Sequence, residues 1–255
     1  MKTIAIITGA SSGIGKEFAL RVAKEYQIDE IWAIARGEDR LRALQAGVPV
    51  KAIPLDLTAP ASVDALSALL REEKPNVKIL CNASGYGKFE SFENVSEEDN
   101  LGMLDLNCRA LTQITYRVLP FMTEGGIVVN IASVAAFQPV PYGNVYAATK
   151  SYVLSFTRSL GRELKSRKIK TLAVCPYWTK TAFFDRANRQ SVITRFDCMY
   201  EPSFIIKKTF RAMKKKKKDF VVPGAVAKLT VFATKLLPHK LVMSVFLRQQ
   251  KLHKK

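Results

Sequence analysis

A serine, a tyrosine and a lysine lie close together in the stretch IASVAAFQPVPYGNVYAATK, residues 131–150. Ser133 is followed by Tyr146 and, about one helical turn later, by Lys150. A cation beside a tyrosine lowers the phenol pKa from its usual value of about 10, so that the phenol can transfer a proton near neutral pH. Ser133 can donate a hydrogen bond to a substrate oxygen on which negative charge develops. This chemistry suits the reduction of a ketone or the oxidation of an alcohol.

The spacing by itself does not distinguish catalysis from coincidence. The chain contains eight tyrosines and many lysines, so a tyrosine four residues before a lysine also arises by chance. Taken singly, Ser133 is typical of a strand end, Tyr146 of a core ring and Lys150 of a solvated helix residue. Other chemistry is disfavoured, because the only histidines are His239 and His253 and no cluster of His, Cys or carboxylates has ligand spacing. We therefore predict neither a Ser-His-Asp hydrolase nor a metal site.

A second chemical signal is the glycine-rich stretch TGASSGIG, which directly follows an apolar run and precedes an amphipathic pattern. Glycines at this junction allow a tight turn and a close approach of the backbone to a pyrophosphate, which the helix N-terminus attracts. A plain turn is the alternative for such a cluster in isolation. The residues predicted to form this phosphate cradle are Thr8, Gly9, Ser11, Ser12, Gly13, Ile14 and Gly15.

The end of the second apolar run indicates which dinucleotide is bound. An NAD site usually has an acidic residue here for the ribose hydroxyls, whereas an arginine accommodates a 2′-phosphate. The sequence has Ala35 followed by Arg36, so NADP is favoured and NAD is the less favoured cofactor. The alternative is that Arg36 is a solvated residue at a strand end.

The elements that must position these residues alternate regularly along the chain. Short apolar runs alternate with helical patterns, which predicts a doubly wound α/β domain with a seven-stranded parallel sheet and helices on both faces. A ligand should then bind at the carboxyl ends of the strands. The runs lie at 3–8, 30–35, 50–55, 77–82, 126–132, 169–175 and 219–224.

Length and composition favour one catalytic domain in a reducing compartment. The chain has 255 residues, of which 48% are hydrophobic, and no charged-then-apolar leader opens it. The four cysteines are far apart, which suits buried thiols and a cytoplasmic location. We predict a domain over 1–224, with a substrate lid at about 177–203, and a basic amphipathic extension over 225–255. We also expect a homo-oligomer, either a dimer or a tetramer.

Between Thr3 and Thr181 the chain resembles the short-chain dehydrogenase/reductase family. Accidental agreement of all the shared motifs in order is negligible, so the resemblance favours catalysis over coincidence. The tail pattern at 220–242 further resembles the branch with 17β-hydroxysteroid and long-chain 3-oxoacyl reductases and their bacterial relatives. The motifs are TGASSGIG at 8–15, LDLT at 55–58, CNASG at 81–85, DLNCRA at 105–110, IAS at 131–133, YAATK at 146–150 and CPYWTKT at 175–181.

The resemblance implies a Rossmann fold and further roles for single residues. Asn107 would complete a catalytic tetrad with Ser133, Tyr146 and Lys150, positioning the lysine through water. Cofactor contacts are implied for Asp56 at the adenine, Asn82 and Ala83 beside the adenosine, Thr181 at the nicotinamide carboxamide, Lys150 at the nicotinamide ribose, and also Leu57, Tyr146, Pro176 and Thr179.

The chain departs from the family pattern at two places. The usual Asn-Asn-Ala-Gly is shifted, with Gly85 one place late, and the usual Pro-Gly is replaced by Pro176 and Tyr177. Tyr177 adds an aromatic ring to the expected substrate pocket.

The substrate class is predicted only broadly. The stretch GYGKF at 85–89 and the aromatic residues of the lid and its start indicate an apolar, elongated carbonyl or alcohol substrate. These aromatic residues are Tyr177, Trp178, Phe183, Phe184 and Phe196. Steroid, fatty-acyl and simple ketone reduction all remain open, and so does packing of these rings on the domain itself. The alternative from another class is a dinucleotide-binding sensor or scaffold with little turnover.

Positive charge is concentrated in the tail. The net charge is +18, and the segment from Ser203 to the end contains fifteen Lys or Arg against one acid, Asp219. Apolar residues at helical spacing before and after Pro238 predict two short amphipathic helices. They could pack on the domain or a second subunit, lie in a membrane interface, or bind nucleic acid, which is disfavoured because few aromatics interleave the charges. We expect peripheral, reversible association with anionic membranes through residues 214–255.

Overall fold

Apolar strands form the centre of the molecule. Seven strands make one sheet in the order β3-β2-β1-β4-β5-β6-β7, and every neighbouring pair is parallel. This confirms the predicted doubly wound α/β fold. The computed structural model describes residues 1–252 apart from 184–186, 188–190 and 216. The strands are β1 (Thr3–Thr8), β2 (Glu30–Ala35), β3 (Val50–Pro54), β4 (Asn76–Asn82), β5 (Ile127–Ile131), β6 (Lys170–Val174) and β7 (Phe220–Val221).

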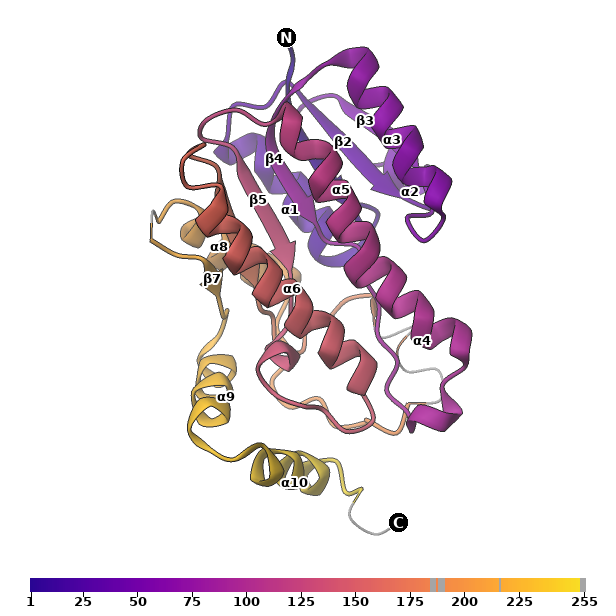
Figure 1. Ribbon diagram of the computed structural model, residues 1–255, viewed down its shortest axis with the longest axis vertical. Coiled ribbons are helices and arrows are strands. Elements are labelled where there is room, and N and C mark those ends of the chain that lie inside the picture. The colour runs from indigo at the N-terminus through magenta and orange to yellow at the C-terminus, as the bar shows by residue number, and fades with distance from the viewer. Residues whose placement is uncertain (184–186, 188–190, 216, 253–255) are drawn as a thin grey trace.

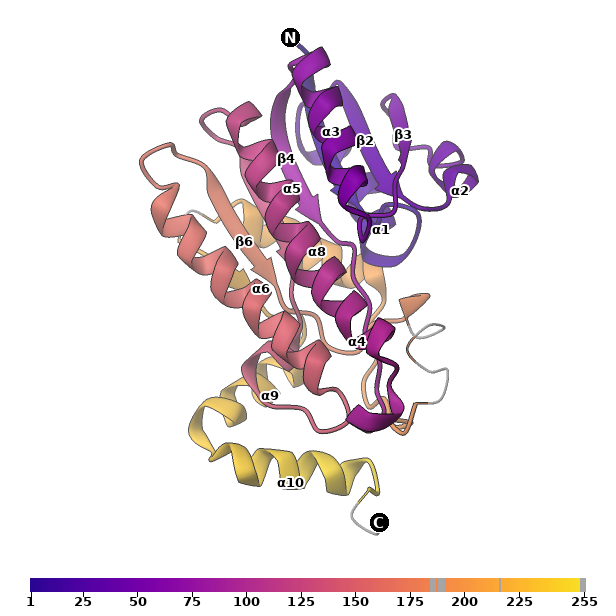
Figure 2. The same cartoon turned by 45° about the vertical axis from the view of Figure 1, so that its right-hand side comes forward.

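Helices connect successive strands and cover both faces of the sheet (Figures 1 and 2). The α-helices are α1 (Gly13–Glu25), α2 (Glu38–Arg42), α3 (Pro60–Glu73), α4 (Glu97–Leu104), α5 (Leu111–Val118), α6 (Asn144–Glu163), α8 (Pro202–Met213), α9 (Ala225–Leu236) and α10 (His239–Gln249). Four short segments complete the description, namely the 3-10 turns η1 (Phe92–Asn94), η3 (Leu119–Phe121) and η4 (Val134–Phe137) and the π-helix η2 (Asp105–Ala110).

Alternation along the strands divides the core into two layers. In β1, Ala5 and Ile7 face one side and pack with Phe18 of α1 and Phe210 of α8. Ile4 and Ile6 face the other side and pack with residues of α3 and α5, such as Leu66 and Ile114. Successive side chains of a strand point to opposite faces, so a strand that is buried on both faces is apolar throughout.

The strand order reverses between β1 and β4. The chain runs outward from β1 through β2 to β3, then crosses back and continues from β4 to β7. Loops that leave β1 and β4 therefore diverge at their carboxyl ends and open a crevice between them. The glycine-rich loop follows β1, so the fold places it at this crevice.

The C-terminal segment continues beyond β7 as two helices at the end of the molecule opposite the N-terminus (Figure 1). The inner side of α9 packs on the body of the protein through Ala227 and Val231. Of the apolar run at 219–224, only Phe220 and Val221 pair with β6, so the seventh strand is shorter than the run. Among the described helices, none is long and apolar enough to cross a membrane.

Two details differ from the sequence-based expectation. The lid was expected over 177–203, but α8 begins at Pro202, and Lys180 and Tyr200 pair through their backbones near the two ends of the segment. Phe184 lies outside the described residues, so its predicted role in the lid has no structural account. Cys81 and Cys175 are buried and Cys108 is half-buried, whereas Cys198 is exposed, so the expectation of buried thiols is wrong for Cys198.

The contact between α1 and α8 predicts a stability measurement. Phe210 is 1% exposed and its ring centroid lies 4.9 Å from that of Phe18. The substitution Phe210→Ala should lower the free energy of unfolding by about 3–5 kcal/mol, because it leaves a cavity in the core. Urea unfolding followed by circular dichroism measures this change. The exposed Tyr116→Ala is the control and should shift stability by less than about 0.5 kcal/mol. A loss below about 1 kcal/mol for Phe210→Ala would contradict this packing.

Candidate active site

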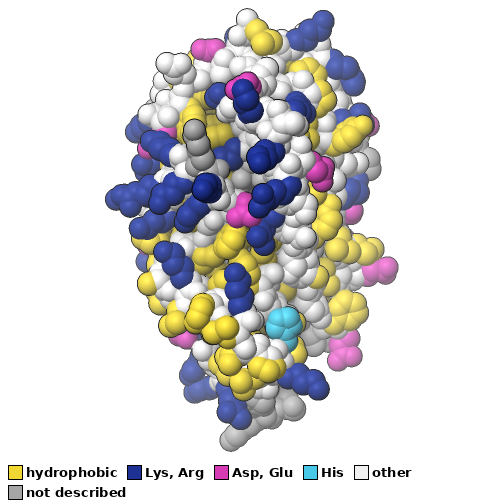
Figure 3. Space-filling view, turned by 60° about the vertical axis from the view of Figure 1, so that its left-hand side comes forward, with side chains coloured by type: hydrophobic (Ala, Val, Ile, Leu, Met, Phe, Trp, Pro, Cys, Tyr) yellow, Lys and Arg dark blue, Asp and Glu magenta, His cyan; other side chains and the backbone are white. Residues whose placement is uncertain are grey.

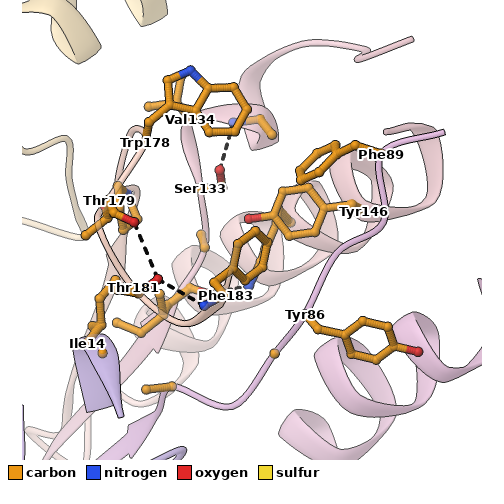
Figure 4. Close-up of a pocket in the computed structure, with 18 of the residues that line it drawn as sticks. Ile14, Tyr86, Phe89, Ser133, Val134, Tyr146, Trp178, Thr179, Thr181 and Phe183 are labelled. Atoms are coloured by element: carbon orange, nitrogen blue, oxygen red, sulfur yellow. Dashed lines mark hydrogen bonds between the residues drawn. The ribbon is translucent and has the colours of Figure 1, made fainter. Parts of the chain in front are cut away.

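A cavity of about 1100 Å³ opens at the carboxyl ends of the central strands. Its wall begins at the glycine-rich loop, passes the ends of β2 and β4, reaches Tyr146 and ends on α9 and α10. Pockets for drug-sized ligands measure about 300–1,000 Å³, so this cavity has room for a dinucleotide or for a comparably large ligand. Figure 4 shows the part of the cavity around Tyr146.

The glycine-rich loop has the geometry of a phosphate cradle. Gly9 has a φ of 67°, and a Cβ on Gly15 would overlap the Gly9 carbonyl oxygen, so neither position accepts a larger residue without rearrangement. No acidic residue lies in the first turn of α1, and its N-cap residue Ser12 makes no side-chain cap hydrogen bond. The free N–H groups and the positive dipole end of α1 are therefore available to an anion. The predicted residues Gly9, Ser11, Ser12, Gly13, Ile14 and Gly15 all line the cavity.

Two arginines lie at the end of β2. Arg36, which the sequence predicts, lines the cavity together with Arg40 of α2, which sequence reasoning missed. Both side chains are exposed, and the Arg40 guanidinium folds back to within 3.5 Å of a Cβ built on Gly37. The neighbouring acid Glu38 pairs with Arg42. The available signal was the four-residue spacing of Arg36 and Arg40 in RGEDR.

Two more of the predicted cofactor contacts, Asp56 at the adenine and Leu57, belong to the loop that follows β3. Asp56 and Leu57 both line the cavity, and Leu57 is 4% exposed. Asp56 Oδ1 accepts hydrogen bonds from the backbone N and from Oγ1 of Thr58, at 3.0 and 2.7 Å. The carboxylate therefore also shapes the turn that precedes α3.

Three of the predicted site residues lie behind the cavity wall. Thr8 Oγ1 accepts hydrogen bonds from the backbone N of Ala83 and of Ser84, both at 3.0 Å, and so fixes the loop after β4. Asn82 Nδ2 donates to Asn130 Oδ1 and to a threonine of α5, so Asn82 joins strands and helix. Asn107 is the third. Of the predicted residues near Asn82, Ala83 does line the cavity.

Asn107 is held in the π-helical segment η2, where it is 1% exposed. Its Oδ1 accepts from the backbone N of Tyr86 at 3.1 Å, and its Nδ2 donates to Tyr86 O at 2.9 Å and to Thr149 Oγ1 at 3.0 Å. Gly85 separates it from Lys150, because a Cβ there would lie 2.8 Å from Asn107 Oδ1 and 3.4 Å from Lys150 Nζ. Asn107 therefore fixes the loop that packs against the lysine.

Tyr146 and Lys150 lie one turn apart on α6, and both are buried. Lys150 Nζ donates to the carbonyl oxygen of Ile131 at 2.8 Å, which ties α6 to the end of β5. Ser133 follows β5, and its Oγ accepts from Ala135 N at 3.1 Å. The structure thus brings Ser133, Tyr146 and Lys150 to one wall of the cavity.

Aromatic rings enclose the tyrosine on the substrate side. The ring centroids of Phe89 and Phe183 lie 5.4 and 5.6 Å from that of Tyr146 (Figure 4). The ring of Tyr146 also packs closely on Gly87, since a Cβ on Gly87 would lie 2.6 Å from Tyr146 Cδ2. Tyr86 points away from this group and donates to Asp99 O at 2.9 Å. Phe89 and Gly87 belong to the GYGKF stretch that the sequence associates with an apolar ligand, whereas their contacts with Tyr146 join distant segments and only the structure shows them.

Burial controls the protonation of the tyrosine and the lysine. It raises the pKa of Tyr146 to about 12, which the Ser133 hydroxyl partly offsets. It lowers the pKa of Lys150 to about 8, which the nearby Cys108 and Cys175 partly offset. The expectation that Lys150 depresses the pKa of Tyr146 is wrong for this chain alone. The ammonium is directed to the Ile131 carbonyl, while the buried phenol loses its solvation.

The segment after β6 closes the cavity beside the glycine-rich loop. Pro176, Thr179 and Thr181, which the resemblance implies as cofactor contacts, all line the cavity, and so does Tyr177. Thr181 Cγ2 lies 3.0 Å from a Cβ built on Gly13, so the two loops are in contact. Thr181 Oγ1 donates to Thr179 O and accepts from Phe183 N, both at 3.4 Å (Figure 4).

Known proteins with similar sequence and structure identify the family. The sequence profile described as short chain dehydrogenase matches residues 3–191. A serine 3-dehydrogenase of Agrobacterium fabrum is 32% identical over 182 residues, 70% of this chain and 72% of that protein. A very-long-chain 3-oxoacyl-CoA reductase of Bos taurus is 32% identical over 189 residues, 69% of this chain and 59% of that protein. A solved short-chain dehydrogenase from Sphingobium yanoikuyae in complex with NADPH is 29% identical, with a TM-score of 0.77 and 96% of each chain covered.

The parallel sheet and the cradle define a nicotinamide-dinucleotide oxidoreductase that acts on CH–OH groups. The chain belongs to the short-chain dehydrogenase/reductase family. This confirms the resemblance that the sequence motifs indicate. Among the described residues no group of three or more His, Cys, Asp or Glu is placed to hold a metal ion.

The buried lysine predicts a pH-dependent stability. An unfolded lysine has a pKa of about 10.4, whereas burial lowers that of Lys150 to about 8. Below the folded pKa the ammonium is charged in both states, and its burial destabilises the fold; the penalty fades as the pH rises from about 8 to about 10.4. Lys150→Met should therefore raise the free energy of unfolding by about 1–3 kcal/mol at pH 7 and by much less at pH 10.

Urea unfolding of the nucleotide-free protein at the two pH values measures this difference. The matched control is Lys165→Met at an exposed position, which should change stability by less than about 0.5 kcal/mol at both. If Lys150→Met raised the free energy of unfolding equally at both pH values, the charge of Lys150 would not be the cause of the gain.

Proposed function

We propose that the protein is an NADPH-dependent oxidoreductase that interconverts a ketone and a secondary alcohol on an apolar substrate. The observation that carries this proposal is the position of the Tyr146 hydroxyl. It points into the cavity near Ser133, between the dinucleotide cradle and a group of aromatic rings (Figure 4). A proton donor there can reach a carbonyl held by apolar contacts.

The residues of the cavity fit a dinucleotide. The cradle of α1 suits the pyrophosphate, because its loop accepts only glycine at Gly9 and Gly15 and its helix end accepts an anion. Arg36 and Arg40 suit a 2′-phosphate on the ribose, and Glu38, one of the two acids between them, pairs with Arg42. The similarity to a chain solved with NADPH supports the same assignment. Thr179 and Thr181 are proposed to contact the nicotinamide end, and Asp56 and Ala83 the adenosine.

The chain's own residues supply the proton and orient the substrate. When bound, the cofactor's nicotinamide ring donates or accepts the hydride. Tyr146 keeps its proton at neutral pH, because burial raises its pKa, and donates it to the substrate oxygen in the reducing direction. Ser133 donates a hydrogen bond to the same oxygen. Lys150 adds positive charge beneath the tyrosine, at 5.7 Å from its ring centroid.

Asn107 is proposed to act by positioning, through the loop that it holds against Lys150. The apolar wall beyond Tyr146 consists of Phe89, Trp178 and Phe183 and continues toward Phe246 of α10. An elongated substrate such as a fatty-acyl or steroid ketone suits this wall. The similarity to a very-long-chain 3-oxoacyl-CoA reductase supports the fatty-acyl class.

Removal of the Tyr146 hydroxyl tests the proposed mechanism. Tyr146→Phe should lower turnover at least about a hundredfold, because it deletes the general acid, while the affinity for NADPH stays nearly unchanged. NADPH consumption with a panel of apolar ketones and 3-oxoacyl thioesters measures turnover. The control is Tyr152→Phe, which removes a phenol from the exposed side of α6. More than about a tenth of the activity remaining in Tyr146→Phe would mean that another group is the acid.

The two arginines predict the cofactor preference. NADPH should bind at least about tenfold more tightly than NADH, equivalent to about 1.4 kcal/mol. The double substitution Arg36→Ala with Arg40→Ala should abolish this preference by weakening NADPH alone. Dissociation constants from nucleotide fluorescence test this, with the exposed Arg71→Ala of α3 as the control. Equal affinities in the unmodified protein, or a preference that survives the double substitution, would refute the assignment.

A further inference from the structure

The outer surface of α9 and α10 is apolar. Five side chains there form what we call the C-terminal apolar face: Leu229, Phe232, Leu236, Leu241 and Val245, which are 69%, 61%, 67%, 48% and 43% exposed. The inward positions of α9 are the smaller Ala227, Val231 and Thr234. The larger apolar residues of this helix therefore face outward, opposite to the usual pattern of a helix on a protein surface. Contiguous exposed patches of this kind mark interaction sites.

The two helices that carry this face contain cations and no acid. The sequence from Phe220 to Leu252 contains no Asp or Glu. Figure 3 shows apolar side chains gathered around the single coloured histidine, with Lys and Arg side chains near them. The basic residues of this segment are Lys228, Lys235, Lys240, Arg248 and Lys251.

The same helices form the outer wall of the cavity. Leu229 belongs both to the face and to the cavity wall, and so does Val245. Gln250 holds α10 in place, because its Oε1 accepts from Arg195 N at 3.1 Å and its Nε2 donates to Arg195 O at 3.0 Å. The mouth of the cavity therefore adjoins the apolar face.

We propose that α9 and α10 dock on the surface of an anionic lipid bilayer, with the C-terminal apolar face inserted among the lipids and the surrounding cations at the headgroups. A basic amphipathic helix that is too short to span a membrane lies in the interface in this way. A second copy of this chain fits less well, because a two-fold interface would oppose the same unneutralised cations. Nucleic acid fits less well because its phosphates would meet the apolar centre of the face.

The docking surface is narrower than residues 214–255, the segment expected from the sequence. Lys214 pairs with Glu25 at the end of α1, at 2.6 Å. The run from Lys214 to Lys218 precedes β7 and thus lies at the amino-terminal edge of the sheet, while α9 leaves the carboxyl edge. These lysines and the apolar face are at different ends of the sheet. Lys216 itself is outside the described residues.

Docking in this orientation directs the mouth of the cavity toward the lipid. An apolar ketone dissolved in the bilayer then reaches Tyr146 along the apolar wall. This access route rests on the proposed function, whereas the docking itself does not.

Co-sedimentation with vesicles tests the docking. The full chain should bind vesicles of mixed phosphatidylglycerol and phosphatidylcholine, bind phosphatidylcholine vesicles at least tenfold more weakly, and dissociate as salt rises. Phe232→Asp with Leu236→Asp should lower binding to the anionic vesicles at least tenfold. Neither residue lines the cavity, so turnover of a water-soluble ketone should be retained. The control Tyr116→Asp introduces a charge at a 73% exposed ring of α5 and should leave binding unchanged.

Three results would overturn the proposal. The first is intact protein that stays in the supernatant with anionic vesicles at low salt. The second is binding that Tyr116→Asp weakens as much as the double substitution. The third is a molar mass, measured by light scattering, that the double substitution reduces, which would make the face a subunit interface. If the unmodified protein bound anionic vesicles but turned over none of the ketones with NADPH, the proposed function would be refuted and the docking would stand.

Discussion

Burial of the Lys150 ammonium is the constraint on which the rest of the site depends. A charge in a low-dielectric interior needs a fixed partner, and here the Ile131 carbonyl at the end of β5 provides it. This bond ties α6 to the end of β5, and Tyr146 lies one turn earlier on the same helix, at the cavity. Gly85 and Asn107 close the other side of the lysine, which explains why a glycine is required there. Burial of this charge lowers stability at a position where the proposed mechanism uses a cation.

A buried polar network extends this rigidity through the sheet. Asn82 of β4 donates to Asn130 of β5, and Asn130 donates to Thr157 of α6. Thr171 of β6 donates to Thr157 O, and Thr115 of α5 accepts from Asn82. Buried hydrogen bonds between side chains specify one arrangement of strands and helices, although Asn82 Oδ1 has no hydrogen-bond partner among the described residues. The network thus holds the strand ends from which the proposed catalytic residues follow, although none of its members lines the cavity.

The positive charge of the tail has two separate environments. Lys214 pairs with Glu25 of α1, and Lys170 donates to backbone carbonyls at the end of α8, so this basic region helps to join α8 to the body of the protein. The cations of α9 and α10 surround an apolar face at the opposite edge of the sheet. The positive charge of the tail therefore lies on two separate surfaces, one beside α1 and α8 and the other on α9 and α10. Only the second adjoins the proposed substrate cavity.

The sequence by itself determined the strands, the glycine-rich loop and the Ser133, Tyr146, Lys150 set, because local periodicity and short spacing express them directly. The spacing of Arg36 and Arg40 was visible in the sequence, but not that both line the cavity. The sequence also could not show that Gly87 packs against Tyr146 or that Gln250 hydrogen-bonds to Arg195, since these contacts join segments that only folding brings together. The sequence also predicted that Lys150 lowers the pKa of Tyr146, whereas burial raises this pKa. That quantity depends on burial and on where the ammonium points. Tertiary structure decided these points, because desolvation and close approach are properties of the packed chain and not of residue order.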